Sequence, residues 1–88
     1  MDSFCTTIGT DTWIVKVEQT CFGCPTVWDG TVERNGEKHD IYIRLRHGVI
    51  RVVLGNDVIL TESVGGGVDG IMSWDEAKPY LAMALQRA

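Results

Sequence analysis

The chain has 88 residues, of which 44% are hydrophobic, and it carries a formal net charge of −4. This length predicts one domain with a single core, and the acidic balance argues against a general affinity for nucleic-acid backbone. The sequence contains no apolar run long enough to span a bilayer and no basic-then-apolar signal peptide, so we expect a cytoplasmic protein.

Three segments open the chain. Residues 1–12 show no clear hydrophobic period, which predicts a partly ordered N-terminal arm. Residues 13–19 alternate apolar and polar side chains, and this period of two predicts a first strand. Residues 20–25 include glycine and proline and predict a loop.

The strongest turn signal is Asn35-Gly36, which lies between two alternating runs. It favours a type I′ turn, because both central residues must take positive φ and Asn and Gly do so at the least cost. A strand over residues 26–34 therefore pairs with one over residues 37–46. In this register opposite charges face each other and so do apolar side chains: Arg34 faces Glu37, Glu33 faces Lys38, and Trp28 faces Ile43.

His47-Gly48 predicts a second two-residue turn, which pairs residues 37–46 with a strand that begins at residue 49. Because side chains alternate between faces, the two turns together define both faces of the sheet. The predicted core face carries Trp28, Ile41, Ile43, Leu45, Ile50, Val52 and Leu54. The predicted outer face carries Asp29, Thr31, Asp40, Tyr42, Arg44, Arg46, Arg51 and Val53.

A turn at residues 55–57 leads into a fifth strand, for which two registers remain open. One register places Glu62 opposite Arg51, where the carboxylate would neutralise the guanidinium. The other register buries Val58 and Leu60 instead.

The last element is a helix. Residues 64–72 include three consecutive glycines and predict a flexible connection. Ser73 and Glu76 then have the spacing of a capping box, which begins a helix over residues 73–87. Pro79 either kinks this helix or opens its main part after a separate first turn. The apolar stripe of the helix consists of Trp74, Ala77, Leu81 and Leu85.

These elements predict one small α+β domain that spans residues 1–88. Its architecture is an antiparallel five-stranded β-meander with one C-terminal helix packed on its core face. Within the domain, the arm, the flexible connection and the helix occupy residues 1–12, 64–72 and 73–87.

The cysteines are the residues that most suggest special chemistry. Three is an odd count, and in the cytoplasm we expect reduced thiols or metal ligands rather than a disulfide framework. Cys21 and Cys24 have the spacing of two zinc ligands or of a dithiol pair, and His47 with Cys5 could complete a zinc site. We favour ordinary thiols, because the second pair of a strong zinc signature is missing. Redox chemistry fits poorly, since the motif leads into a strand rather than a helix.

The sequence shows no recognisable catalytic constellation. It has two histidines, no nucleophile-elbow motif and no cluster of carboxylates. The glycine-rich stretch lacks the Lys-Ser/Thr step of a phosphate-binding loop. We therefore expect neither an enzyme nor a bound cofactor.

The predicted outer face places Arg44 directly across from Arg51, and like charges in that position are unfavourable without a counter-charge. We predict a protein-binding surface made of Tyr42, Arg44, Arg46 and Arg51, because tyrosine and arginine are enriched at interface hot spots. Three alternatives remain open: a solvated face balanced by nearby acids, a nucleic-acid-associated module that uses the arginines, and a zinc-binding domain that uses the cysteine pair.

Three motifs occur together in this chain: the Gly23-Cys24-Pro25 step, Trp28-x-Gly30, and the hairpin Arg44-x-Arg46-x-Gly48. Over residues 18–31 and 42–48 this pattern resembles small uncharacterised proteins of actinobacteria and their phages. The resemblance implies a phage-related accessory protein, a class that often acts by binding a host protein. It carries over no catalytic or ligand residues.

The expected function is therefore that of a small non-enzymatic protein-binding module, either a phage-derived accessory protein or a host-directed inhibitor. We expect a protein partner and no membrane association, and we favour a protein over a nucleic acid, which stays the alternative partner. A homodimer formed through an edge strand is a further expectation, because unpaired strands offer free backbone groups.

Overall fold

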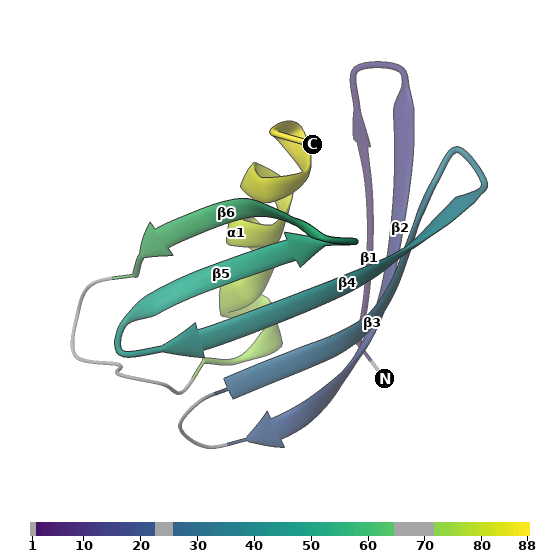
Figure 1. The fold of residues 1–88 in the computed structure, drawn as a ribbon. Coiled ribbons are helices and arrows are strands. Elements are labelled where there is room, and N and C mark those ends of the chain that lie inside the picture. Colours follow the sequence, from purple (N-terminus) through teal and green to yellow (C-terminus); the bar gives the residue numbers. More distant parts are fainter. Residues whose placement is uncertain (1, 23–25, 65–71) are drawn as a thin grey trace.

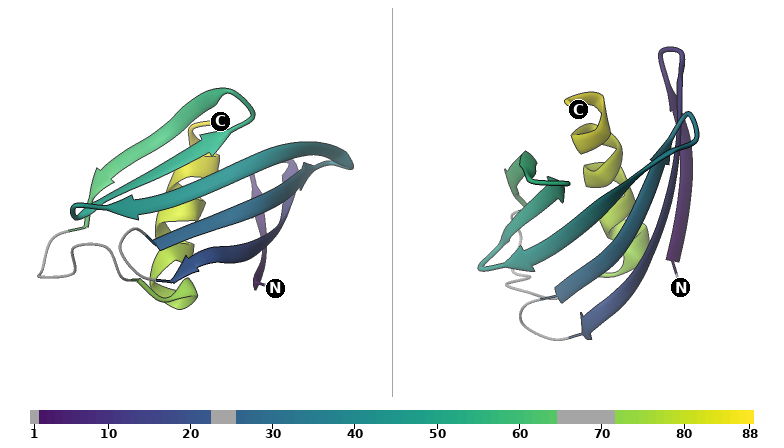
Figure 2. Two further views of the ribbon diagram at one scale, coloured as in Figure 1. Left: turned by 60° about the horizontal axis from the view of Figure 1, so that its bottom comes forward. Right: turned by 45° about the vertical axis from the view of Figure 1, so that its right-hand side comes forward.

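The computed structural model describes residues 2–22, 26–64 and 72–88. Within these residues, six strands form one antiparallel sheet in chain order, and a helix follows them. The elements are β1 (Asp2–Ile8), β2 (Asp11–Phe22), β3 (Thr26–Arg34), β4 (Glu37–Arg46), β5 (Val49–Leu54), β6 (Asp57–Ser63) and α1 (Trp74–Gln86). The sheet curls into a half-barrel around α1, so the protein is an α+β fold with a concave, helix-covered face and a convex outer face (Figures 1 and 2).

The prediction of a partly ordered N-terminal arm over residues 1–12 is wrong, because residues 2–8 form the strand β1. Residues 2–8 pair antiparallel with β2 along their whole length, which gives the sheet six strands rather than five. Phe4 and Ile8 pack against the core from this strand. Ser and Thr residues surround these two side chains, so the apolar period in the sequence is too weak to predict a strand. β2 also extends beyond the predicted residues 13–19, because a β-bulge between Gln19 and Cys21 lets the pairing continue.

Both predicted two-residue turns are confirmed. Asn35 and Gly36 have φ values of 51° and 87°, and His47 and Gly48 have φ values of 54° and 71°. Positive φ at both central residues is the signature of the type I′ turn, whose twist matches that of the flanking strands. The pairing of β3 with β4 and of β4 with β5 follows the predicted register residue by residue.

The apolar core of the described residues lies between the concave face of the sheet and α1. Its fully buried side chains come from five strands and from the helix: Trp13, Val15, Val17, Trp28, Val32, Ile41, Ile43, Leu45, Ile50, Val52, Leu60, Ala77, Leu81, Ala84 and Leu85. The predicted core face is thus confirmed, except that Leu54 is only partly buried.

Two tryptophans attach β1 to this core. The rings of Trp28 and Trp74 pack against each other, with centroids 5.7 Å apart. The Trp28 indole Nε1 donates to Oδ2 of Asp2 at 3.2 Å, and the Trp74 Nε1 donates to the Ser3 carbonyl oxygen at 3.2 Å. Hydrogen bonds from β3 and α1 therefore hold β1 in the sheet, although the hydrophobic pattern of β1 is weak.

The strand β6 follows neither predicted register along its whole length. Its turn falls at residues 55–56, and the pairing shifts at a β-bulge that leaves Ile59 without a partner on β5. Because the bulge reverses which side chains face inward, Val58 is 56% exposed whereas Leu60 is 2% exposed.

The turn at residues 55–56 and the bulge together overturn the predicted pairing of Glu62 with Arg51. Beyond the bulge, Thr61 lies opposite Arg51, and Glu62 lies opposite Ile50. The carboxylate of Glu62 therefore belongs to the concave side of an edge strand and not to the outer face.

The helix begins as predicted. Ser73 is its N-cap and forms a capping box with Glu76, while Ala77, Leu81 and Leu85 are buried as the apolar stripe requires. Pro79 lies within α1, so the alternative of a separate first turn is wrong. Seven residues of the predicted flexible connection, 65–71, lie outside the described residues. α1 is neither long nor apolar enough to cross a membrane.

Candidate functional site: an arginine patch on the outer face

The hairpin of β4 and β5 gathers three arginines on the convex face. Arg44 lies directly opposite Arg51, as the two turns predicted, and Arg46 lies opposite Val49 at the end of the same hairpin. Arg44 is partly buried, whereas Arg46 and Arg51 are exposed. We call Arg44, Arg46 and Arg51 the arginine patch.

A shallow hollow lies between these side chains. It has a volume of about 240 Å³ and is lined by the arginine patch together with His47 and Val49. The Arg46 Nε donates to the His47 Nε2 at 3.2 Å, so the turn residue helps to hold one arginine beside the hollow. A carboxylate or a phosphate oxygen fits this chemistry, because the guanidinium group presents several N–H donors in one plane.

The arginine patch has no acidic partner within the described part of the chain. The ion pairs found there join Arg34 to Asp11, His39 to Glu37, and Lys78 to Asp75. The cross-strand neighbours of Arg44 and Arg51 are Val27 and Thr61, respectively, neither of which is charged. Asp29, which lies diagonally across from Arg44 on the outer face, forms no ion pair with it, so no described acidic group lies within ion-pair distance of the patch.

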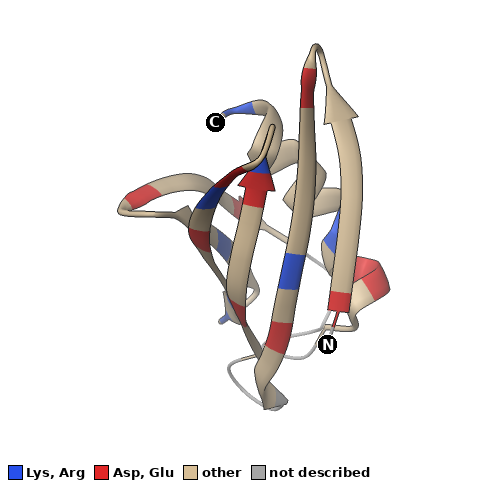
Figure 3. Ribbon diagram, turned by 90° about the vertical axis from the view of Figure 1, so that its right-hand side faces the viewer, with Lys and Arg blue, Asp and Glu red and all other residues tan. Residues whose placement is uncertain are grey.

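Elsewhere the outer face carries charges of both signs. On β2 and β3 the exposed or partly buried outward residues include Lys16, Glu18, Asp29 and Glu33. Figure 3, which views the molecule from the right-hand side of Figure 1, shows acidic and basic segments along these strands. Within the described residues, the β4–β5 hairpin is thus the place where several arginines without an ion-pair partner gather, in a chain whose net charge is −4.

A row of less polar side chains borders the patch. Tyr42 lies opposite Val53, and Val53 lies opposite Val58, so these three residues cross β4, β5 and β6 on the outer face. Tyr42 and Val53 are partly buried, and Val58 is largely exposed. We call Tyr42, Val53 and Val58 the apolar row. Tyr42 was predicted as part of the binding surface, and the structure places it in this row rather than beside the hollow.

The structure does not assemble the suggested zinc site from its described residues. Cys21 lies on the outer face opposite Val27, and Cys5 is an exposed thiol on β1. Among the residues that the structure describes, no group of three or more His, Cys, Asp or Glu side chains could hold a metal ion. Cys24 lies outside the described residues.

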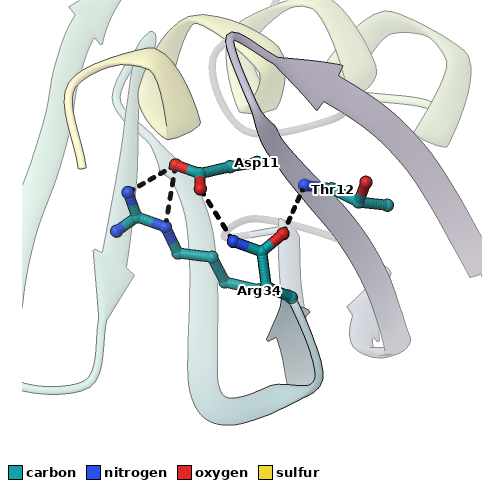
Figure 4. Close-up of polar contacts among 4 residues, drawn as sticks. Asp11, Thr12 and Arg34 are labelled. Atoms are coloured by element: carbon teal, nitrogen blue, oxygen red, sulfur yellow. Dashed lines mark hydrogen bonds and ion pairs between the residues drawn. The ribbon is translucent and has the colours of Figure 1, made fainter.

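A larger hollow, of about 750 Å³, opens at the opposite end of the sheet and is lined in part by Trp13, Arg34 and Arg87. The Arg34 Nε and Nη2 donate to Oδ2 of Asp11 at 3.1 and 2.5 Å, and Asn35 donates to the other Asp11 oxygen at 2.8 Å (Figure 4). The Arg34 guanidinium also lies over the Trp13 ring at 4.9 Å.

These contacts determine whether the charge of Arg34 is free to attract an anionic ligand. Hydrogen bonds from Arg34 and then from Asn35 hold the pKa of the Asp11 carboxyl below its ordinary value of 3.8. Asp11 therefore stays ionised and neutralises Arg34. This hollow presents less free positive charge than the arginine patch, which is the stronger candidate site.

Two features of the site were not predicted from the sequence. The first is the bulge at Ile59, which lets Leu60 reach the core while Val58, placed opposite Val53 by the turn at residues 55–56, stays exposed; no local turn residue indicates that bulge. The second is the hydrogen bond that His47, predicted as a turn residue and considered as a metal ligand, accepts from Arg46.

Comparisons of this chain with models of protein families, with curated proteins and with solved structures give no match.

Proposed function

We propose that the protein is a small non-enzymatic binding module whose arginine patch and apolar row together receive an acidic surface of a protein partner. The observation that carries the proposal is the direct opposition of Arg44 and Arg51 without a counter-charge among the described residues.

This opposition is costly in the free protein. Like charges directly opposite each other on neighbouring strands are unfavourable by a few tenths to about 1 kcal/mol. Glu62, the residue that could have relieved the repulsion from within the fold, lies opposite Ile50 instead. An acidic partner would supply the missing counter-charge, so the repulsion would be relieved only in the complex.

The neighbourhood of the patch favours a protein over a nucleic acid. Tyr42, Val53 and Val58 add an aromatic and aliphatic surface beside the arginines, and this combination is typical of protein interfaces. A nucleic-acid backbone would instead reward a broad basic surface, which a net charge of −4 does not provide.

The resemblance to small proteins of actinobacteria and their phages supports a narrower version of the proposal. In that version the module is a phage-derived accessory protein or inhibitor, and the acidic partner is a host protein. The interior of a host cell is then the place where the two proteins meet.

We expect the double substitution Arg44→Ala with Arg51→Ala to leave the free energy of unfolding within about 1 kcal/mol of the parent. The same change should weaken capture of the native partner by at least about tenfold, because truncated hot-spot arginines commonly cost that much. Affinity capture from the native host with quantitative mass spectrometry measures the second effect, and urea denaturation measures the first.

The double substitution Lys16→Ala with Lys38→Ala is the matched control, because it removes the same charge from the outer face away from the patch. Equal capture by both double variants would show that the arginine patch is ordinary solvated surface. A salt-sensitive gel shift with DNA or RNA that only the arginine variant loses would instead assign the patch to nucleic acid.

A further inference from the structure

The strand β1 is an edge of the sheet that carries little protection against pairing with another strand. Among the described strands it pairs with β2 alone. Between Asp2 and Ile8 it contains no lysine, no proline and no bulge, which are the devices that usually block an edge. The other edge strand, β6, carries the bulge at Ile59 and the acidic residues Asp57 and Glu62. β1 is therefore the edge that is open to a further strand.

The turn at residues 9–10 shows which backbone groups of β1 point away from β2. Ile8 lies opposite Asp11, so this pair closes a two-residue hairpin and is hydrogen-bonded. Because such pairs alternate along an antiparallel ladder, Ser3, Cys5 and Thr7 direct their N–H and C=O groups away from β2. A second observation agrees, since the Ser3 carbonyl oxygen accepts a hydrogen bond from the Trp74 indole outside the sheet. This carbonyl already has one partner, so the outward groups of Cys5 and Thr7 are the ones on which a further strand would pair.

The helix leaves room beside this edge. A groove of about 470 Å³ lies between Ser3, Phe4 and Cys5 of β1 and a stretch of α1 that includes Pro79 and Ala82. Cys5 and Thr7 are exposed. The free backbone groups around the centre of β1 are thus accessible.

We propose that β1 pairs antiparallel with β1 of a second copy of this chain, with the two-fold axis at Cys5. In this register Ser3 lies opposite Thr7, so hydroxyl side chains meet across the interface. Asp2, the one charged residue of β1, lies opposite Ile8, so no like charges face each other. Residues with outward-directed backbone groups then lie opposite one another, as an antiparallel ladder requires.

The dimer would join two half-barrels through a continuous sheet. β1 and the β4–β5 hairpin are separated by β2 and β3 in the sheet, so both arginine patches stay accessible. Two copies of the patch on one particle would bind a multivalent partner more tightly than one copy does. This interface does not depend on the proposed function, and either could hold without the other.

Sedimentation velocity over a micromolar to millimolar concentration series tests the proposal. We expect a reversible dimer of modest affinity, because one added strand pair buries less surface than a standard interface. In the variant Cys21→Ser with Cys24→Ser, a short bis-maleimide should link Cys5 to Cys5 and give a covalent dimer. Cys5→Ser in the same background is the control and should stay monomeric under the reagent.

Two proline substitutions distinguish this edge from other interfaces. Thr7→Pro removes an outward N–H and should weaken dimerisation by at least about tenfold while the melting temperature of the monomer stays close to the parent. Thr6→Pro removes an N–H of the β1–β2 ladder and should lower the melting temperature. A monomer at every concentration would overturn the proposal, and so would a Thr7→Pro protein that dimerises as tightly as the parent.

Discussion

Replacing Ile43 with aspartate is expected to abolish folding of the domain. Ile43 is 0% exposed and lies opposite Trp28 on β3 and Val52 on β5. A carboxylate at this position loses its hydration and gains no partner, which costs several kcal/mol. That is a large share of the roughly 5–15 kcal/mol that stabilise a domain of ordinary size. Circular dichroism should show no cooperative thermal transition for Ile43→Asp.

Arg44→Asp is the matched control, because residue 44 is the next residue of β4 and lies on the outer face. The new carboxylate stays in water and lies opposite Arg51, so the free energy of unfolding should remain within about 1 kcal/mol of the parent. Equal melting temperatures for the two variants would show that the two faces of the sheet are assigned wrongly.

Gly30→Ala is the second change with a large expected effect. A Cβ atom at residue 30 would lie 2.2 Å from the Lys16 carbonyl oxygen and 2.7 Å from the Val17 Cα. Both are backbone atoms of β2, so the clash cannot be relieved by a side-chain rotation and the two strands must separate. We expect a loss of about 3 kcal/mol of unfolding free energy, measured by urea denaturation.

Thr31→Ala controls for the general effect of a substitution in β3. Thr31 is the next residue of the strand and faces outward opposite Lys16, so its truncation should cost less than about 1 kcal/mol. If Gly30→Ala were as mild as Thr31→Ala, the close approach of β2 and β3 at residue 30 would be wrong.

The turns explain why much of the fold follows from the sequence. Asn35-Gly36 and His47-Gly48 each fix a two-residue hairpin, and a hairpin of known turn length fixes the opposing residues. Once the register is fixed, the alternation of side chains assigns every residue of β4 to a face. The placement of Ile43 in the core and of Arg44 opposite Arg51 follows from this local chemistry.

The elements that the sequence did not predict depend on distant contacts. β1 is held by its ladder with β2 and by hydrogen bonds from the Trp28 and Trp74 indoles, and its own hydrophobic pattern is weak. The bulge at Ile59 has no signature residue nearby. It allows Leu60 to reach the core although Val58 is exposed, and this outcome reflects packing of the whole sheet.

The candidate site also combines a property that the sequence predicts with one that it does not predict. The opposition of Arg44 and Arg51 was predictable, because it depends only on the His47-Gly48 turn. The lack of a counter-charge was not predictable, because it depends on the bulge that turns Glu62 toward the concave side. The unusual property of the arginine patch thus combines a local feature with a tertiary one.

Mutual repulsion between Arg44 and Arg51 in the free protein is the physical basis of the proposed function. Arg51→Glu replaces that repulsion with an ion pair across β4 and β5, at an exposed site where the substitution disturbs no packing. A gain of a few tenths to about 1 kcal/mol would raise the melting temperature of a domain of this size by about 1–8 °C. The same variant should no longer capture the acidic partner.

The most direct measurement is the difference in melting temperature between Arg51→Glu and the parent at low and at high salt, with Arg51→Gln as the control for side-chain shape. We predict that Arg51→Glu melts higher than both other proteins at low ionic strength, and that the difference largely disappears in about 1 M salt, where exposed charges are screened. A melting temperature for Arg51→Glu equal to or below that of the parent at low salt would contradict the presence of uncompensated charge in the arginine patch.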